Sequence, residues 1–179
     1  MDFVAFFRNV NLGQPRSPTR PQLEAALAQA GALQPRSFQT NGTVVFSAAD
    51  EPDAQAALDR ACQALQGVCG LKEPAFIERL EVLVSLSAAQ PFAGYEQAGW
   101  DDFSATLMSA ATAARLALPL AASRGALEVV QVEHATVLSV VRRLPGHPLS
   151  ATPFFERLLG APVTTRGWGT ILRLVKKFA

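Results

Sequence analysis

The sequence predicts an α+β protein made of two tandem domains, each with the element order β-α-β-β-α-β and an antiparallel sheet. Short apolar runs rich in Phe and Val, typical of buried strands, alternate with stretches in which Leu and Ala recur at helical spacing. The dipeptide Asn41-Gly42 lies between two strand-like runs and indicates a hairpin. This order of elements is the split βαβ arrangement of ferredoxin-like domains.

The first domain is predicted to span residues 1–79. Pro21 is favourable in the first turn of a helix and Gly31 is typical of a helix end, so we expect one helix between them. Asn41 and Gly42 are expected to form a type I′ turn, in which both central residues need positive φ. The expected elements are a strand at 2–7, this helix, strands at 36–40 and 43–47, a helix from about 52 to 66 and a strand at 74–78.

The second domain is predicted to span residues 80–179 and to begin with a connecting helix that ends at Pro91. Residues 92–101 are expected to form a loop because they contain two glycines and no helical or strand periodicity. The second cycle then has a strand at 103–109, a helix from about 111 to 118, strands at 126–133 and 135–143, a helix at 152–160, a short strand at 161–165 and a terminal helix at 170–178.

Composition and charge narrow the classes of function. The chain has 179 residues, of which 49% are hydrophobic and 17% charged, as in globular proteins. Its net charge of +1 and pI of about 7.8 weigh against recruitment of nucleic acid or of an anionic membrane. The N-terminus has an acid at Asp2 and a short apolar run, so no secretory signal is expected, and no segment reaches the ~18 apolar residues of a membrane span. We therefore expect a cytoplasmic protein.

Cysteine and histidine are too few for a structural metal site. Cys62 and Cys69 have no histidine nearby, and His134 and His147 are the only histidines of the chain. Zinc usually takes four ligands from closely spaced pairs. We expect two buried, reduced thiols, no metal and no cofactor.

The loop after the first strand is one candidate binding site. Arg8 and Asn11 leave the end of a buried strand, where a rigid base displays side chains. Arg and Asn can hydrogen-bond a carboxylate or a phosphate, and Arg can do so with two bonds. The alternative is that residues 11–13 form only a turn and that the arginines of the loop are solvated. Its single glycine is not the several that a dinucleotide site needs.

The segment TTRGWGT, residues 164–170, is the second candidate. If Gly169 or Thr170 caps the terminal helix, the first N–H groups of that helix are free donors. Arg166 beside them would complete an anion site. Trp168 either stacks on a ring of the ligand or seals the loop against the core.

Groups suited to catalysis are few. His134 is interpreted as part of a turn between two strands, and His147 is the better candidate for a general base, with an exposed loop histidine as the simpler interpretation. Asp101 and Asp102 could bind a cation or act as acid and base. Adjacent acids at the entrance to a strand are usually solvated, and we interpret this pair in that way.

The segments VAFFRNVNLG (4–13), FQTNGTVVF (38–46) and ERLLGAPVTTRGWGTILRL (156–174) resemble the bacterial family known as domain of unknown function 1697. The resemblance spans essentially the whole chain in the same order. It implies two tandem ferredoxin-like domains and no established activity. Gly167 and Gly169 stand where that family has asparagine, which would remove amide groups from any shared pocket. The residues that match its motifs are Arg8, Asn11, Gly13, Gly42, Val44, Val45, Phe46, Thr164, Thr165, Arg166, Trp168 and Thr170.

Three functions are compatible with the sequence. The first is a small-molecule binding protein, in which an anionic metabolite is held by Arg8, Asn11, Arg166, Trp168 and Thr170. The second is an enzyme for a phosphorylated or carboxylated metabolite, which would use the loop histidine or the acid pair. The third is a structural or interaction module, whose motifs pack the two domains or a homodimer together. No membrane partner is expected, and the charge balance disfavours nucleic acid.

Overall fold

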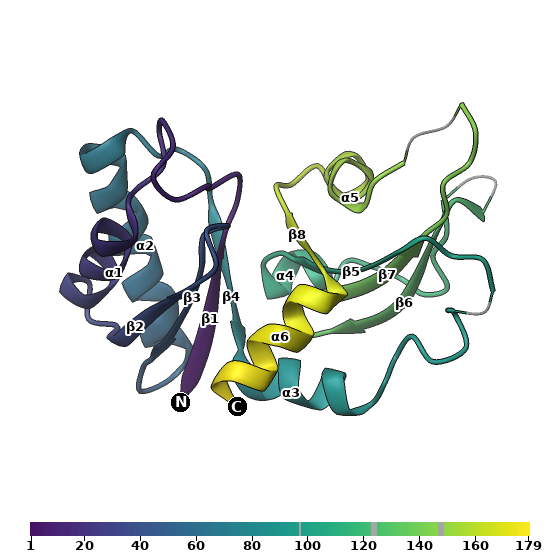
Figure 1. Ribbon diagram of the computed structural model, residues 1–179, viewed down its shortest axis with the longest axis horizontal. Coiled ribbons are helices and arrows are strands. Elements are labelled where there is room, and N and C mark those ends of the chain that lie inside the picture. The colour runs from purple at the N-terminus through teal and green to yellow at the C-terminus, as the bar shows by residue number, and fades with distance from the viewer. Residues whose placement is uncertain (97, 123–124, 147–148) are drawn as a thin grey trace. The chain divides into compact units, whose positions relative to one another are not determined.

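The computed structural model describes residues 1–96, 98–122, 125–146 and 149–179. The chain divides into two compact units, Met1–Glu81 and Val82–Ala179 (Figure 1). Within the described residues, each unit contains a four-stranded antiparallel sheet with helices packed on it. The predicted fold class, two tandem ferredoxin-like domains, is confirmed. None of the helices in these ranges is both long and apolar enough to cross a bilayer.

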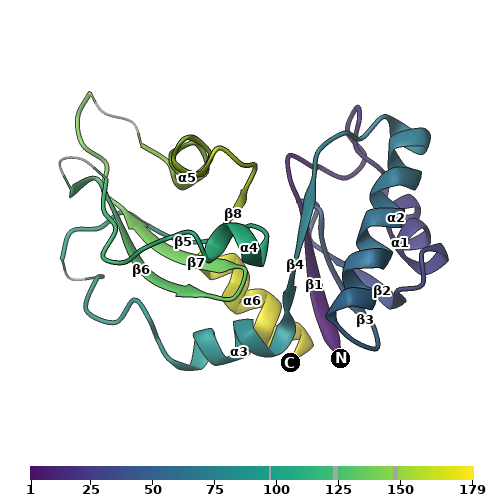
Figure 2. The same cartoon turned by 180° about the vertical axis from the view of Figure 1, so that it is seen from behind.

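The first unit has the predicted order of elements. They are β1 (Asp2–Phe7), α1 (Arg20–Gln29), β2 (Leu33–Phe38), β3 (Thr43–Ser47), α2 (Glu51–Cys69) and β4 (Ala75–Arg79). The strands lie in the order β2-β3-β1-β4, and each neighbouring pair is antiparallel. Both helices cover one face of this sheet (Figures 1 and 2).

Side chains define the helix ends in this unit. Thr19 caps α1: its side chain accepts a bond from the backbone of Gln22, whose Oε1 accepts the Thr19 N–H at 2.8 Å. Asp50 caps α2 by accepting the Asp53 N–H at 2.9 Å. Gly70 ends α2 with a φ of 73°, a left-handed conformation that glycine adopts without strain.

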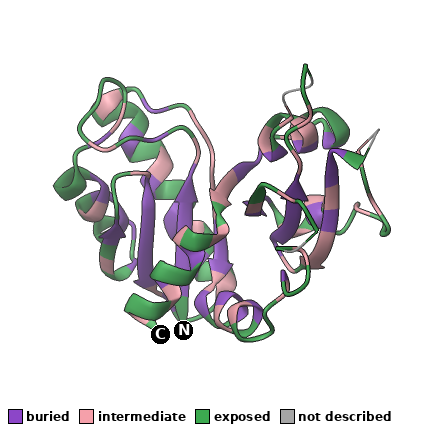
Figure 3. Ribbon diagram, turned by 45° about the vertical axis from the view of Figure 1, so that its right-hand side comes forward, coloured by how far each residue is buried: buried purple, intermediate pink, exposed green. Residues whose placement is uncertain are grey.

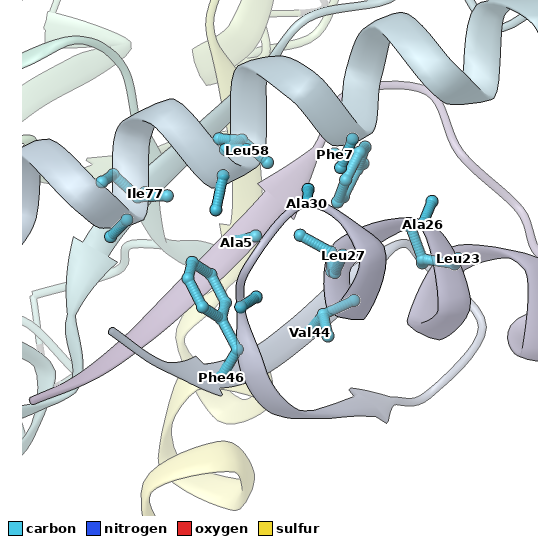
Figure 4. Packing of buried hydrophobic residues seen from close by; sticks show 14 of the residues in the cluster. Ala5, Phe7, Leu23, Ala26, Leu27, Ala30, Val44, Phe46, Leu58 and Ile77 are labelled. Carbon is cyan, nitrogen blue, oxygen red and sulfur yellow. The ribbon is translucent and has the colours of Figure 1, made fainter. Parts of the chain in front are cut away.

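The core of the first unit lies between its helices and its sheet (Figure 4). Phe7, Leu27 and Leu58 come from β1, α1 and α2, and all three are fully buried. Burial of one such side chain stabilises the fold by about 1.5–3 kcal/mol. Figure 3 shows the corresponding pattern, with buried residues on the strands and exposed residues on the outer faces of the helices.

The hairpin between β2 and β3 is present, but the predicted type I′ turn is wrong. The loop has four residues, 39–42, and the residues with positive φ are Gln39 at 59° and Gly42 at 68°. Asn41 does not have a positive φ.

The reason for the longer loop is its contact with the segment that follows β1. The Phe7 N–H donates to the Gly42 carbonyl and the Leu12 N–H donates to the Thr40 carbonyl, each at 2.8 Å. A Cβ on Gly42 would lie 2.7 Å from the Cβ of Val10, closer than real Cβ atoms approach. Glycine is therefore required at this position both by its φ and by the space around it.

The second unit repeats the arrangement with one helix added at each end. Its elements are α3 (Leu80–Ala88), which starts at the unit boundary, β5 (Asp102–Leu107), α4 (Ala110–Ala113), β6 (Leu127–Glu133), β7 (Thr136–Val141), α5 (Ala151–Leu159), β8 (Thr164–Gly167) and α6 (Trp168–Phe178). The strand order is β6-β7-β5-β8. Helices α4 and α5 lie on one face of the sheet and α6 lies on the other (Figures 1 and 2).

The helix predicted at about 111–118 is much shorter, because α4 ends at Ala113. The chain beyond it is drawn into pairing with β6. The Ala122 N–H donates to Leu127 at 2.8 Å and the Val129 N–H donates to Leu120 at 2.9 Å. These bonds hold residues 120–122 in an extended conformation beside β6, although the alanine content of the chain after α4 favours a helix.

Candidate functional site

The second unit contains a cleft of about 750 Å³ between the start of α6, the start of β5 and the loop after α3. This volume lies within the range of about 300–1,000 Å³ that is typical of small-molecule sites. The lining residues all belong to the second unit: Ser87, Gln90, Phe92, Ala93, Glu96, Asp101, Asp102, Phe103, Gly167, Trp168, Gly169 and Leu172.

Three aromatic rings form one wall of this cleft. The ring centroid of Phe92 lies 5.2 Å from that of Phe103 and 5.3 Å from that of Trp168, with interplanar angles of 70° and 75°. Such edge-to-face contacts stabilise aromatic pairs beyond the burial of their area. Phe92 is only 4% exposed, whereas Trp168 is half-buried. Phe92 thus packs against Trp168, while part of the Trp168 side chain remains exposed at the cleft.

Helix α6 begins earlier than predicted. Gly167, not Gly169 or Thr170, is the N-cap, and Trp168 is the first helical residue. The expectation of a cap at Gly169 or Thr170 is therefore wrong, because β8 continues to Gly167 and leads straight into the helix. A Cβ on Gly167 would meet no atom within 4 Å, and one on Gly169 would meet only Arg173 Nη1 at 3.7 Å. These two glycines keep the cleft open at the start of α6.

Three carboxylates, from Glu96, Asp101 and Asp102, also line the cleft. Arg143 holds two of them: its backbone N–H donates to Asp101 Oδ2 at 2.6 Å, and its Nη2 lies 3.1 Å from Asp102 Oδ1. Both side chains of this ion pair are more than half exposed, at 74% and 51%, so the pair contributes little to stability. No Lys, Arg or His occurs among the described residues that line the cleft.

The loop that carries Phe92 and Glu96 is held by contacts with β6 and with Arg142, the residue after β7. The Tyr95 hydroxyl donates to Glu128 Oε1 at 2.8 Å, and this bond, aided by burial, raises the pKa of Tyr95. The guanidinium of Arg142 lies 4.6 Å from the Trp100 ring centroid and donates to the Ala98 carbonyl at 2.9 Å. These contacts fix one wall of the cleft in place.

Residues 1–137 match the model of a protein family described as "Protein of unknown function (DUF1697)". The chain belongs to this family. The match covers the first and second motifs of the sequence, whereas the segment 164–170 lies beyond it. No curated protein matches the chain.

One solved structure has the same fold as this chain. It is the conserved bacterial protein SP0830 from Streptococcus pneumoniae, which is similar over 98% of this chain and 97% of that one, with a TM-score of 0.62 and 15% sequence identity. At this identity the likeness shows the fold alone.

Of the five binding residues predicted from the sequence, Trp168 lines the cleft. Arg166 lies in β8, where its Nη1 donates to Thr164 Oγ1 at 2.8 Å and to the Thr165 carbonyl at 3.1 Å. Burial lowers the pKa of Arg166 to about 10. Thr170 Oγ1 accepts from Arg173 at 3.1 Å. Arg166 and Thr170 are therefore near Trp168 in the sequence but are not lining residues.

The other two predicted binding residues belong to the first unit. Arg8 forms an ion pair with Glu73. Asn11 is exposed in a turn, and its backbone N–H donates to Ser17 Oγ at 3.1 Å. Residues 12 and 13 lie in a turn, in which the Gln14 N–H donates to the Asn11 carbonyl at 3.0 Å. The loop arginines are not merely solvated, because Arg8 pairs with Glu73 and Arg20 donates to the Ser37 carbonyl.

The remaining titratable candidates are the two histidines and the two cysteines. His134 lies in the turn between β6 and β7, as interpreted, with a φ of 50°. His147 lies outside the described residues. Cys62 and Cys69 are free thiols, half-buried rather than buried, and burial and then Asp59 raise the pKa of Cys62 to about 11. In the part of the chain that the structure describes, no three His, Cys, Asp or Glu side chains gather as metal ligands would.

Sequence reasoning missed most of the cleft. Phe92, Glu96 and Phe103 were assigned only to a loop and a strand. One available signal was Pro91, which has no N–H and follows Gln90 in a positive-φ conformation of 48°. Such a break at the end of a helix places the next residue, Phe92, at a sharp change of direction. No pattern in the sequence indicated that α6 would pack against the same face as Phe103.

Proposed function

We propose that the protein binds a small organic molecule with a flat apolar ring in the cleft of its second unit. The observation that supports this most directly is the wall of Phe92, Phe103 and Trp168 inside a cleft of about 750 Å³. Ligand sites are typically concave, mostly apolar and aromatic, and carry a few polar groups that orient the ligand. Ser87 and Gln90, at the end of α3 and just beyond it, supply such polar groups here.

The cleft is built on well-supported elements. Ile171 and Leu174 of α6 are fully buried, and α6 packs on β5 and β8. The facing loop is tied down through Tyr95 and Arg142. A site held by packed elements loses little conformational entropy when a ligand enters, which favours binding by a small molecule.

The residues used in this proposal differ from those expected from the sequence. It uses Trp168, together with Phe92 and Phe103, and does not use Arg8 or Asn11 of the first unit. Leu172 lies one turn after Trp168 on α6 and extends the apolar surface of the cleft.

The two tryptophans of the chain make a direct test possible. Trp100 is not among the lining residues, and phenylalanine keeps an aromatic ring for the guanidinium of Arg142. The variant Trp100→Phe therefore has a single tryptophan, the lining residue Trp168. Titration with 2-phenylethanol should change Trp168 fluorescence and saturate in the high-micromolar to millimolar range expected of so small a ligand. Saturation should also raise the Tm of the second unit by mass action.

Two leucine variants provide a matched comparison in the Trp100→Phe background. Leu172 and Leu158 are both exposed leucines on helices, at 40% and 48%, and only Leu172 lines the cleft. Leu172→Ala should weaken binding of 2-phenylethanol several-fold, whereas Leu158→Ala should leave it unchanged. Absence of a saturable response in folded Trp100→Phe protein, or equal weakening by both leucine variants, would overturn the proposal.

A further inference from the structure

We infer that the ligand of this cleft carries a cationic group, such as a primary ammonium, next to its apolar ring. The inference rests on the proposed function and adds the chemical class of the ligand. It reverses the sign of charge that the sequence predicted for the ligand.

The charge of the cleft lining favours a cationic ligand. Glu96, Asp101 and Asp102 contribute carboxylates, and the described lining residues include no basic side chain. Clefts lined by one sign of charge focus the electrostatic field and attract ligands of the opposite sign. An anionic ligand would have to lose solvent beside these carboxylates without a cationic partner in the lining.

Three positive features lie next to the lining residues. Arg143 pairs with Asp102, Arg173 Nη1 lies 3.7 Å from the Cβ position of Gly169, and the N-terminus of α6 carries roughly half a unit of positive charge. Their summed charge is smaller than that of the three carboxylates, and neither arginine belongs to the lining. The guanidinium of Arg143 is largely exposed, and the same carboxylate can share its hydrogen bonds with a second cation.

The aromatic wall of the cleft also favours a cationic ligand. The interplanar angles of 70° and 75° show that Phe92 does not stack face to face with Phe103 or with Trp168. Indole is the best aromatic partner for a cation, because its ring face is electron-rich. The same unit already contains such a contact, between Arg142 and Trp100 at 4.6 Å. Aromatic faces next to carboxylates are the combination that recognises an organic ammonium group.

Three probes with the same phenylethyl group separate the charge from the ring. They are phenethylamine, which is a cation at neutral pH, 2-phenylethanol, which is neutral, and 3-phenylpropionate, which is an anion. In the Trp100→Phe protein, phenethylamine should bind roughly three- to tenfold more tightly than 2-phenylethanol, and 3-phenylpropionate should bind most weakly. Raising the salt concentration from about 0.1 M to 1 M should narrow these differences, because the Debye length falls from about 10 Å to 3 Å.

A pair of charge-neutralising variants assigns the effect to the cleft. Glu96→Gln removes one carboxylate from the lining and should reduce the ratio of the affinity for phenethylamine to the affinity for 2-phenylethanol. Glu133→Gln changes an exposed carboxylate at the end of β6, outside the lining, and should leave the preference as it is. Equal affinity for all three probes, or tightest binding of 3-phenylpropionate, would overturn the cationic class and leave the proposed function standing. Failure of all three probes to bind would overturn both.

Discussion

The rings of Phe92 and Trp168 meet edge to face, with centroids 5.3 Å apart, and so join the loop after α3 to the first residue of α6. These residues are far apart in the chain and meet only in the folded second unit. The same contact supports the aromatic wall of the cleft. Stability of the second unit and binding in its cleft are therefore coupled through this pair.

Phe92→Ala should expose this coupling. Phe92 is almost completely buried, and removing such a ring costs about 3–5 kcal/mol of unfolding free energy. Urea denaturation followed by tryptophan fluorescence reports on the second unit, because both tryptophans lie in it. Leu158→Ala, at an exposed position on α5, should change the unfolding free energy by no more than about 0.5 kcal/mol. A loss in Phe92→Ala as small as that of this control would show that the pair does not hold the two elements together.

Gly42→Ala should destabilise the first unit far more than Gly13→Ala. Both glycines have positive φ, at 68° and 82°, so alanine is strained at either position by about 1–2 kcal/mol. Only at Gly42 does the added Cβ also collide, at 2.7 Å from Val10, which adds about 1–3 kcal/mol. A Cβ on Gly13 meets nothing within 4 Å.

The first unit contains no tryptophan, so tryptophan fluorescence does not report on its unfolding. The two glycine variants can instead be compared by far-UV circular dichroism in urea. We expect Gly42→Ala to lose about 2–5 kcal/mol and Gly13→Ala about 1–2 kcal/mol. Equal losses would mean that backbone conformation alone accounts for both, and that the loop can move away from Val10.

Local signals explain why so much of the fold could be predicted from the sequence. Pro21 and Gly31 mark a helix through interactions within a few residues, and Asn41-Gly42 marked the hairpin for the same reason. The errors occurred where distant contacts decide the conformation. The hairpin loop is longer because it bonds to the segment after β1, and α4 is shorter because the chain after it pairs with β6.

The cleft depends on such distant contacts throughout, and this is why only Trp168 of the five predicted binding residues is a lining residue. Its lining comes from the loop after α3, from β5 and from the start of α6. Arg166 and Trp168 are two residues apart, so a continuous strand would place both side chains on one face, but the change from β8 to α6 at Gly167 breaks this relation. Arg166 lies within β8 and Trp168 begins the helix, so the two side chains do not share the lining.

Stability of the first unit should depend on the protonation of Cys62 at high pH. The pKa of this thiol is about 11 in the folded chain, against about 8.5 for an exposed cysteine. Between these values the unfolded chain has lost a proton that the folded chain still holds. Unfolding therefore becomes more favourable as the pH rises through this window, by about 1–3 kcal/mol, and there is no such effect below it.

The test for Cys62 compares the Cys69→Ala protein with the Cys62→Ala/Cys69→Ala protein. Urea denaturation followed by circular dichroism from pH 8 to pH 11 should show the steeper loss of stability in the protein that keeps Cys62. Parallel pH profiles would mean that the Cys62 thiol is solvated enough to ionise normally.

Gly169→Asn should weaken ligand binding without destabilising the protein. Gly169 is in the first turn of α6, lines the cleft and has open space where a Cβ would stand. An asparagine side chain there would occupy part of the volume beside Trp168, and Asn is a better helix former than Gly by a few tenths of a kcal/mol. In the Trp100→Phe background, we expect at least a several-fold rise in the Kd for 2-phenylethanol with an unchanged or slightly higher Tm.

Gly67→Asn is the matched control for this substitution. Gly67 is an exposed helical glycine of α2 with nothing within 4 Å of its Cβ position, and it lies in the first unit. The same gain in helix propensity is expected there, with no effect on the Kd. If Gly169→Asn left the affinity for 2-phenylethanol as high as Gly67→Asn does, the ligand would have to lie away from the start of α6. The proposed contact between the ligand and Trp168 would then be disproved.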